Sequence, residues 1–228
     1  MRPTIRGFLL LAAISSCAHA ASLCATATMA VYTTPNFSCF ISDKLFSNFL
    51  YSSTADGNGI AVASTNVTVT PDFSDPNNPG FHFSSNGWLA VSHATDTFDT
   101  FVDSSISFSV ATLSGQPLID DNTLSLDSFF VSGAPFTMFG DIAETLDNGT
   151  SYAVDTGGPF IDHKTFPLTS HLVVNKDLFV GAAGGFESVA QIFQFSENFS
   201  EIGAPEPVSF VLFGCGLLGV GILRRRRS

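Results

Sequence analysis

Residues Ser104–Val110 read SSISFSV, so polar and apolar side chains alternate from Ser105 to Val110. Successive side chains of a β-strand point to opposite faces. Ile106, Phe108 and Val110 would therefore share one face and the serines the other. The pattern predicts a strand with one face in a hydrophobic core and the other in water.

The same period of two recurs in other segments, most clearly in Thr123–Phe130, where Leu124, Leu126 and Phe130 have equal parity. In Ile60–Thr70 the apolar parity changes, which predicts a bulge or burial on both faces. The segment from Leu45 to Leu50 suits a helical turn as well as a strand. Further strands are expected at Thr28–Thr33, Phe81–Phe83, Trp88–Ser92, Phe136–Thr145, Leu172–Asn175, Leu178–Val180 and Val189–Phe195.

Clusters of Gly, Pro, Asn and Asp separate these segments and indicate turns. They occur at Asp56–Gly59, Asp75–Gly80, Asp147–Gly149 and Gly157–Pro159. About ten short strands without a strong helix predict an all-β fold, an antiparallel β-sandwich or jelly-roll-like domain.

Charge is distributed unevenly along the 228 residues. Six of the nine basic residues lie at the two ends, and residues 21–204 hold three lysines against 19 acidic residues, a net charge of −16. Phosphate contacts need clustered lysine or arginine, so a nucleic-acid partner is excluded. Charged residues make up only 13% and hydrophobic residues 45%, which predicts a folded core rather than disorder.

The N-terminus has the features of a secretory signal peptide over residues 1–20. Arg2 and Arg6 precede an apolar stretch, and Ala18 and Ala20 form an A-x-A site that places signal peptidase cleavage before Ala21. A lipoprotein signal is the alternative, because the residues leading to Cys17 resemble a lipobox. In that case Cys17 would be lipidated and would tether the chain to a membrane.

The C-terminus combines three features in order: Pro205-Glu206-Pro207, the apolar run Val208–Leu223 and the arginines Arg224, Arg225, Arg226 and Arg227. As a helix the run would be about 24 Å long, and the arginines would stay on the cytoplasmic side. This arrangement resembles the PEP-CTERM sorting signal of Gram-negative bacteria. The resemblance covers about 25 residues (204–228).

The resemblance implies that an exosortase processes the chain near Pro205-Glu206-Pro207. The protein would be held in the inner membrane by its C-terminal helix before processing, and would then reach the cell surface or the extracellular space. Exopolysaccharide becomes a candidate partner. The expected organisation is a signal peptide (1–20), a β-sandwich ectodomain (21–203) and the sorting signal (204–228).

Of the four cysteines, Cys17 would be removed with the signal peptide and Cys215 lies in the apolar run. The remaining pair, Cys24 and Cys39, would be exported to an oxidising compartment, so we expect a disulfide between them. Its loop of about 15 residues would contribute about 3 kcal/mol in the chain-entropy model.

No catalytic motif is found, and the sequence assigns no catalytic residue and no cofactor. For metal ligands it offers only weak candidates. Asp162-His163 beside the many serines is a weak triad candidate. The remaining histidines of residues 21–204 are expected at the surface. Asp72, Asp75 and Asn77 are weak calcium candidates in a proline-rich loop, and solvated turn residues are the simpler interpretation.

Sugar-binding sandwiches present aromatic platforms, but this chain has 24 phenylalanines, three tyrosines and one tryptophan. Phenylalanine lacks a polar group and is expected in the core. The sequence therefore predicts a non-enzymatic structural or interaction protein of the cell envelope or extracellular matrix. The alternative is an extracellular carbohydrate- or calcium-binding module, and a secreted hydrolase is the third possibility.

Processing is directly testable by mass spectrometry of the mature protein. We expect a new N-terminus at Ala21 and a C-terminus that lacks Arg224–Arg227. An intact arginine tail on the exported form would contradict exosortase processing. A lipid-modified Cys17 at the N-terminus would show that the lipoprotein signal is used instead.

Overall fold

The computed structural model describes residues 21–134 and 136–201. The expected signal peptide and sorting signal lie outside these ranges. Within them, no helix has both the length and the apolar character needed to cross a membrane.

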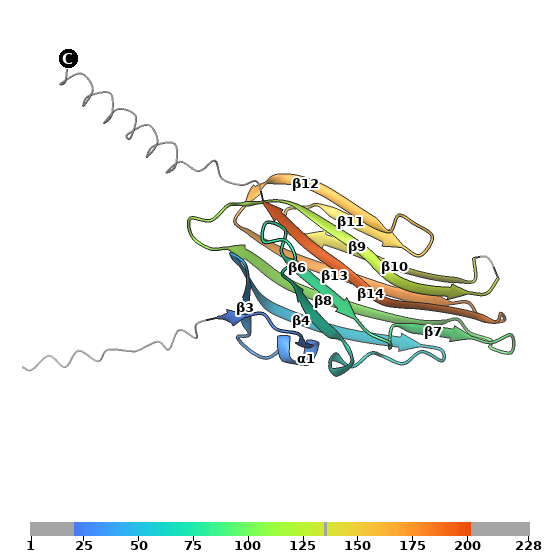
Figure 1. The fold of residues 1–228 in the computed structure, drawn as a ribbon. Coiled ribbons are helices and arrows are strands. Elements are labelled where there is room, and N and C mark those ends of the chain that lie inside the picture. The colour runs from blue at the N-terminus through green and yellow to red at the C-terminus, as the bar shows by residue number, and fades with distance from the viewer. Residues whose placement is uncertain (1–20, 135, 202–228) are drawn as a thin grey trace, which may run out of the picture.

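The described chain forms two seven-stranded sheets that pack face to face (Figure 1). Paired strands are antiparallel, except that β1 and β3 are parallel. Sheet A runs in the order β1 (Ser22–Leu23), β3 (Ser38–Ile41), β4 (Lys44–Asp56), β8 (Thr100–Thr112), β13 (His171–Ala182), β10 (Met138–Leu146) and β11 (Ser151–Asp155). The expected antiparallel β-sandwich is confirmed.

Sheet B faces sheet A and contains the last long strand of the described chain, β14. One edge of β14 pairs with β9, and the other pairs first with β7 and then with β6. Sheet B runs in the order β12 (Ile161–Thr169), β9 (Ile119–Ser132), β14 (Ser188–Glu201), β6 (Gly80–Ser84), β5 (Thr68–Asp72) and β2 (Ala27–Thr28), with β7 (Leu89–Ser92) beside β14.

Phenylalanine rings from both sheets form the centre of the core. Phe46 of β4 lies 4.7 Å, ring centroid to centroid, from Phe81 of β6, at an interplanar angle of 75°. Phe108 of β8 meets Phe199 of β14 edge to face at 6.2 Å. Such edge-to-face pairs are the preferred aromatic geometry. The predicted strand Ser104–Val110 lies within β8, and its apolar side chains are buried as expected.

Two of the strand predictions were wrong. Thr28–Thr33 is largely the short helix α1 (Met29–Tyr32), whose buried Met29 and Tyr32 stand three residues apart, which is a helical spacing. Ile60–Thr70 is broken by the 3-10 helix η1 (Ser64–Asn66), and only its end belongs to β5.

The ambiguous segment from Leu45 to Leu50 is part of β4. Its register against β8 shifts between Ser47 and Leu50, and Asn48 has a φ of 57°. This β-bulge lets Phe46 and Phe49 both point into the core although they have opposite parity. The bulge therefore produced the helix-like spacing in the sequence.

The Cys24–Cys39 disulfide is confirmed. Both cysteines are buried, and the bond joins the segment after β1 to β3. The backbone N–H of Cys24 also donates to the carbonyl of Phe40 at 2.9 Å. The first described strand is thereby held to the edge of sheet A by both a covalent and a backbone link.

A buried ionic cluster joins the two sheets near their middle. The ammonium of Lys176 on β13 forms ion pairs with Glu144 on β10 and with Glu197 on β14, the latter at 2.6 Å. Asn122 on β9 donates to Glu144 at 2.7 Å and to Glu197 at 2.8 Å. All four residues are at most 2% exposed. One cation thus faces two carboxylates away from water.

Burial and the neighbouring Glu144 charge raise the pKa of Glu197 to about 8, although Lys176 and the Asn122 hydrogen bond act in the opposite direction. The Glu197 carboxyl therefore takes up a proton near neutral pH. This proton reduces the excess negative charge of the cluster.

This pKa predicts a stability that falls as pH rises. Between the ordinary glutamate pKa of 4.5 and about 8, the folded state binds more protons than the unfolded state, so the free energy of unfolding decreases with pH. We expect Glu197→Gln to flatten that decrease in thermal melts over the same pH range. An unchanged pH slope in this variant would contradict the assignment.

Glu187→Gln is the matched control, because Glu187 is an exposed glutamate. Hydrogen bonds from the Ala94 backbone and the His93 ring lower its pKa. Its contribution to stability therefore grows as pH rises through the acidic range. Removing it cannot flatten the decrease that we assign to Glu197.

Candidate functional site

Three phenylalanines lie on the outer face of sheet A, one on each of three adjacent strands. They are Phe101 on β8, Phe179 on β13 and Phe139 on β10, and we call them the platform. The flanking Leu178 and Val180 are buried, so the alternation of β13 turns Phe179 away from the core. The platform is therefore a surface feature of three adjacent strands of sheet A, close to the start of β8 and β10 and the end of β13.

The rings form a continuous stack. The Phe179 centroid lies 5.4 Å from that of Phe101 and 5.3 Å from that of Phe139, with interplanar angles of 25° and 13°. Phe139 is 49% exposed. Stacked pairs at this spacing are favourable and hold each other in place.

Gly181 makes room for the stack. It pairs with Phe101 on one side and with Phe139 on the other. A Cβ atom at this position would lie 2.8 Å from Cζ of Phe139 and 3.0 Å from Cε1 of Phe179. The absence of a side chain lets the rings close over the strand.

Carboxylates surround the central ring. Asp103 and Asp141 stand directly opposite Phe179 on the two neighbouring strands, where Cβ atoms lie about 4.5–5.5 Å apart. Asp177 is two residues before Phe179 on the same face. These three residues, Asp103, Asp141 and Asp177, are called the acidic border below.

Burial and mutual repulsion raise the pKa of two of these carboxyls. For Asp103 the causes are burial, a hydrogen bond with Asp177, and the charges of Asp177 and Asp141. For Asp141 they are burial and the charges of Asp177 and Asp155. Asp103 and Asp141 therefore hold protons more tightly than free aspartate.

The platform also forms one wall of a depression of about 100 Å³, together with Asp99, Gly181 and Ala183. An exposed aromatic surface next to carboxylate acceptors can bind a sugar ring. The ring's C–H face lies on the phenyl groups, while its hydroxyl groups donate to the carboxylates. The arrangement is a binding surface built from residues of three strands.

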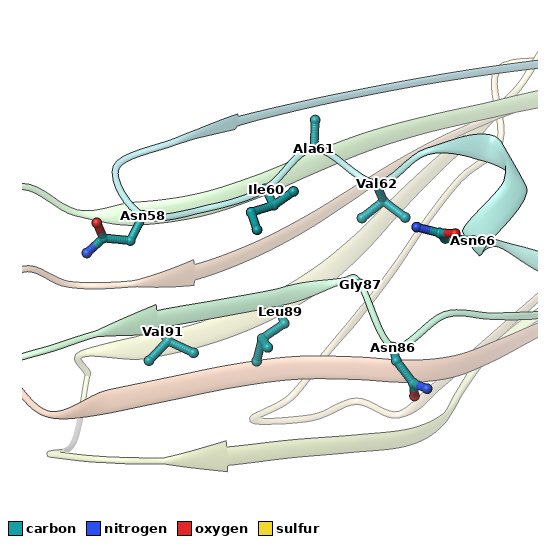
Figure 2. Close-up of a pocket in the computed structure, with 9 residues that line it drawn as sticks. All are labelled: Asn58, Ile60, Ala61, Val62, Asn66, Asn86, Gly87, Leu89 and Val91. Carbon is teal, nitrogen blue, oxygen red and sulfur yellow. The ribbon is translucent and has the colours of Figure 1, made fainter.

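A second concavity, of about 300 Å³, lies between residues 60–62 and β7 (Figure 2). Aliphatic side chains such as Val62 and Leu89 line it, with Asn58 at one end and Asn66 and Asn86 toward the other. The segment is held to β4, because Tyr51 donates to the Val62 carbonyl at 2.9 Å and Val62 N–H donates to Ser53 at 3.0 Å. No charged side chain lines this groove, so it lacks groups for acid–base chemistry.

The sequence-based calcium candidates take part in turn hydrogen bonds. Asp72 accepts from the Ser74 N–H at 2.8 Å and from Asn198 at 3.1 Å, and Asp75 accepts from the Asn77 N–H at 2.9 Å. Within residues 21–134 and 136–201, no group of three or more His, Cys, Asp or Glu side chains is arranged to hold a metal.

The weak triad candidate is not assembled. Asp162 forms an ion pair with Lys164 at 2.9 Å, and the His163 ring shares a 2.8 Å hydrogen bond with Thr123. Neighbouring residues on a strand point to opposite faces, which keeps Asp162 and His163 apart.

The other histidines form separate contacts. His82 lies between Asp72 at 3.8 Å and Asp127 at 3.4 Å. His93 contacts Glu187 at 3.2 Å, and His171 is exposed. Each histidine is thus placed with different partners on the surface.

One pair of facing carboxyl groups, Glu144 and Glu197, belongs to the core. Glu144 and Glu197 are 1% and 0% exposed and are bridged by Lys176 and Asn122. A glycosidase needs its acid pair on either side of a bound glycosidic bond. A glycan cannot reach these two side chains.

Sequence reasoning missed the platform, although a signal was present. The expected strand Leu178–Val180 has its apolar ends in the core, and the same parity places Phe179 outward beside Asp177. Phe139 has the parity opposite to the buried Ile142. The alignment of the three strands, which brings the rings together, was not visible in the sequence.

No family model and no curated protein matches this chain. Among solved structures it is similar to TmCBM61 in complex with β-1,4-galactotriose, with 13% identity, a TM-score of 0.27, and coverage of 66% of this chain and 88% of that one. A GH31 α-xylosidase from Xanthomonas citri matches at 9% identity and a TM-score of 0.19, over 78% of this chain and 27% of the xylosidase. Both TM-scores are too low to carry an inference about function.

The role of Gly181 can be tested by Gly181→Ala. The new methyl group would displace the Phe139 ring, which is the free end of a side chain and can move. Alanine also costs less backbone entropy than glycine in a strand, by about 0.5–1 kcal/mol. We expect a crystal structure to show Phe139 rotated away from Phe179 and the melting midpoint to change by only a few degrees. An undisturbed stack in the variant would contradict this role.

Proposed function

We propose that this chain is an exported polysaccharide-binding protein of the cell envelope or extracellular matrix, and that the platform is its binding surface. The observation that carries the proposal is the stack of Phe101, Phe179 and Phe139 on the solvent face of sheet A, next to the acidic border. The proposed activity is binding rather than catalysis.

The position of the rings supports this function. Phenylalanine is expected in the core, so three aligned rings on a solvent face need a reason other than folding. Polar residues share that face, among them Ser105, Ser107 and Asn175 on β8 and β13, and isolated apolar residues such as Val173 and Leu50 lie among them. An aromatic strip next to carboxylates and hydroxyl side chains suits a ligand that has both C–H faces and hydroxyl groups, as a glycan does.

Export and sorting are part of the proposal. The signal peptide, the Pro205-Glu206-Pro207 motif, the apolar run and the terminal arginines support secretion and exosortase processing. The Cys24–Cys39 disulfide is consistent with an oxidising compartment. A matrix or envelope location would bring the platform next to the exopolysaccharide.

Affinity electrophoresis of the exported protein tests the binding. Gels would contain a neutral glucan, chitin fragments, chitosan or alginate. We expect the wild type to be retarded by at least one polymer, and Phe179→Ala to lose about tenfold in affinity, or about 1.4 kcal/mol, because Phe179 is the shared member of both ring pairs.

Phe160→Ala is the matched control. Phe160 is 46% exposed and stacks on Phe129 at 5.3 Å, but on sheet B. We expect this variant to bind like the wild type. Retardation that is equal in the wild type and both variants, or absent with every polymer, would overturn the proposed function.

A further inference from the structure

We infer that the ligand of the platform is a cationic glycan, a β-linked polymer of amino sugars with free, protonated amines, rather than a neutral or acidic polysaccharide. This inference rests on the proposed function and specifies its substrate class. It follows from the charges around the rings and from the position of every lysine in the described residues.

The border presents carboxylates on more than one side of the central ring. Asp103 and Asp141 flank Phe179 across the sheet, and Asp177 lies next to it along β13. A sugar that lies over the exposed side of the stack would have its equatorial substituents directed outward over these side chains. An ammonium group at such a position would meet at least one carboxylate, and the aromatic face itself attracts cations.

No lysine in the described residues is available to neutralise the border. Lys44 pairs with Glu201 at 2.5 Å, Lys164 with Asp162, and Lys176 with Glu144 and Glu197. The sequence contains no arginine between residues 7 and 223. The platform is therefore in a negative field that repels uronic-acid and sulfated polymers and attracts polycations.

The carboxyls of the border repel one another, and a bound cation would reduce this repulsion. Their mutual repulsion is among the causes that raise the pKa of Asp103 and of Asp141. An ammonium group placed between them would offset this repulsion, whereas a hydroxyl group would leave it in place. The gain in binding free energy from offsetting this repulsion is therefore specific to a charged amine.

Three hexasaccharides with the same β-1,4 linkage separate the possibilities, because they differ only at carbon 2. The glucosamine hexamer carries an amine, the N-acetylglucosamine hexamer an acetamide and cellohexaose a hydroxyl. Calorimetry with the protein in its exported form is run at about pH 6, where most amines of the glucosamine hexamer are protonated and aspartates of ordinary pKa are ionised. We expect the glucosamine hexamer to bind about tenfold more tightly than the other two, with an advantage that shrinks as salt is added.

Two double variants identify the charges responsible. Asp103→Asn with Asp141→Asn removes the carboxylates that flank Phe179 and should abolish the preference for the amine. Asp75→Asn with Asp147→Asn removes the same charge from two exposed turns. The side-chain amide that replaces the Asp75 carboxylate retains an oxygen acceptor for the Asn77 N–H, so the turn is preserved. This control should keep the preference.

The outcomes distinguish the two proposals. Equal affinity for the three hexamers, with loss of binding in Phe179→Ala, would overturn the inference of a cationic ligand. The proposal that the platform binds polysaccharide would then still stand. A preference reduced equally by both double variants would show a general charge effect and would also overturn the inference. If none of the hexamers and none of the polymers binds, the proposed function fails as well.

Discussion

The position of Lys176 in the core is the constraint on which the rest of this structure depends. Its ammonium must remain with Glu144 across the β10–β13 pair and with Glu197 of the opposite sheet. A slip of one residue in β13 would turn Lys176 outward and leave the buried carboxyl groups of Glu144 and Glu197 without a cation, and breaking a buried ion pair typically costs about 3–5 kcal/mol. The ionic cluster therefore holds the register of sheet A and attaches it to sheet B.

The outer face follows from the same register. With Lys176, Leu178 and Val180 inward, Asp177, Phe179 and Gly181 must point outward. Pairing with β8 and β10 then places a phenylalanine on each side of Gly181 and an aspartate on each side of Phe179. The same strand alignment thus places the ionic cluster on the inner face of sheet A and the platform on its outer face. The cluster also removes a cation from the exterior, which keeps the field around the platform negative.

Sequence reasoning succeeded where local pattern and burial agree. The strand Ser104–Val110, the sandwich and the Cys24–Cys39 bond were all predicted. It left Leu45–Leu50 open between strand and helical turn, because the bulge at Asn48 gives a strand a helix-like spacing. It failed at Met29 and Tyr32, whose spacing was interpreted as part of a strand but belongs to a helical turn. The phenylalanines were assigned to the core as a class, which is right for Phe46, Phe81 and Phe108. It is wrong for Phe139, because parity along each strand decides which face a residue takes.

The sequence by itself determined the class of fold, the disulfide, the acidic character of residues 21–204 and the expectation of export, because each depends on composition or on neighbours along the chain. Tertiary structure decided which residues meet across strands. Phe101, Phe139 and Phe179 are 38 or more positions apart in the chain and form one stack only through the β8–β13–β10 pairing. The tertiary structure also places Glu144 and Glu197 in the core, where they cannot serve as an acid pair at the surface. Register between distant strands carries this information, and no local pattern encodes it.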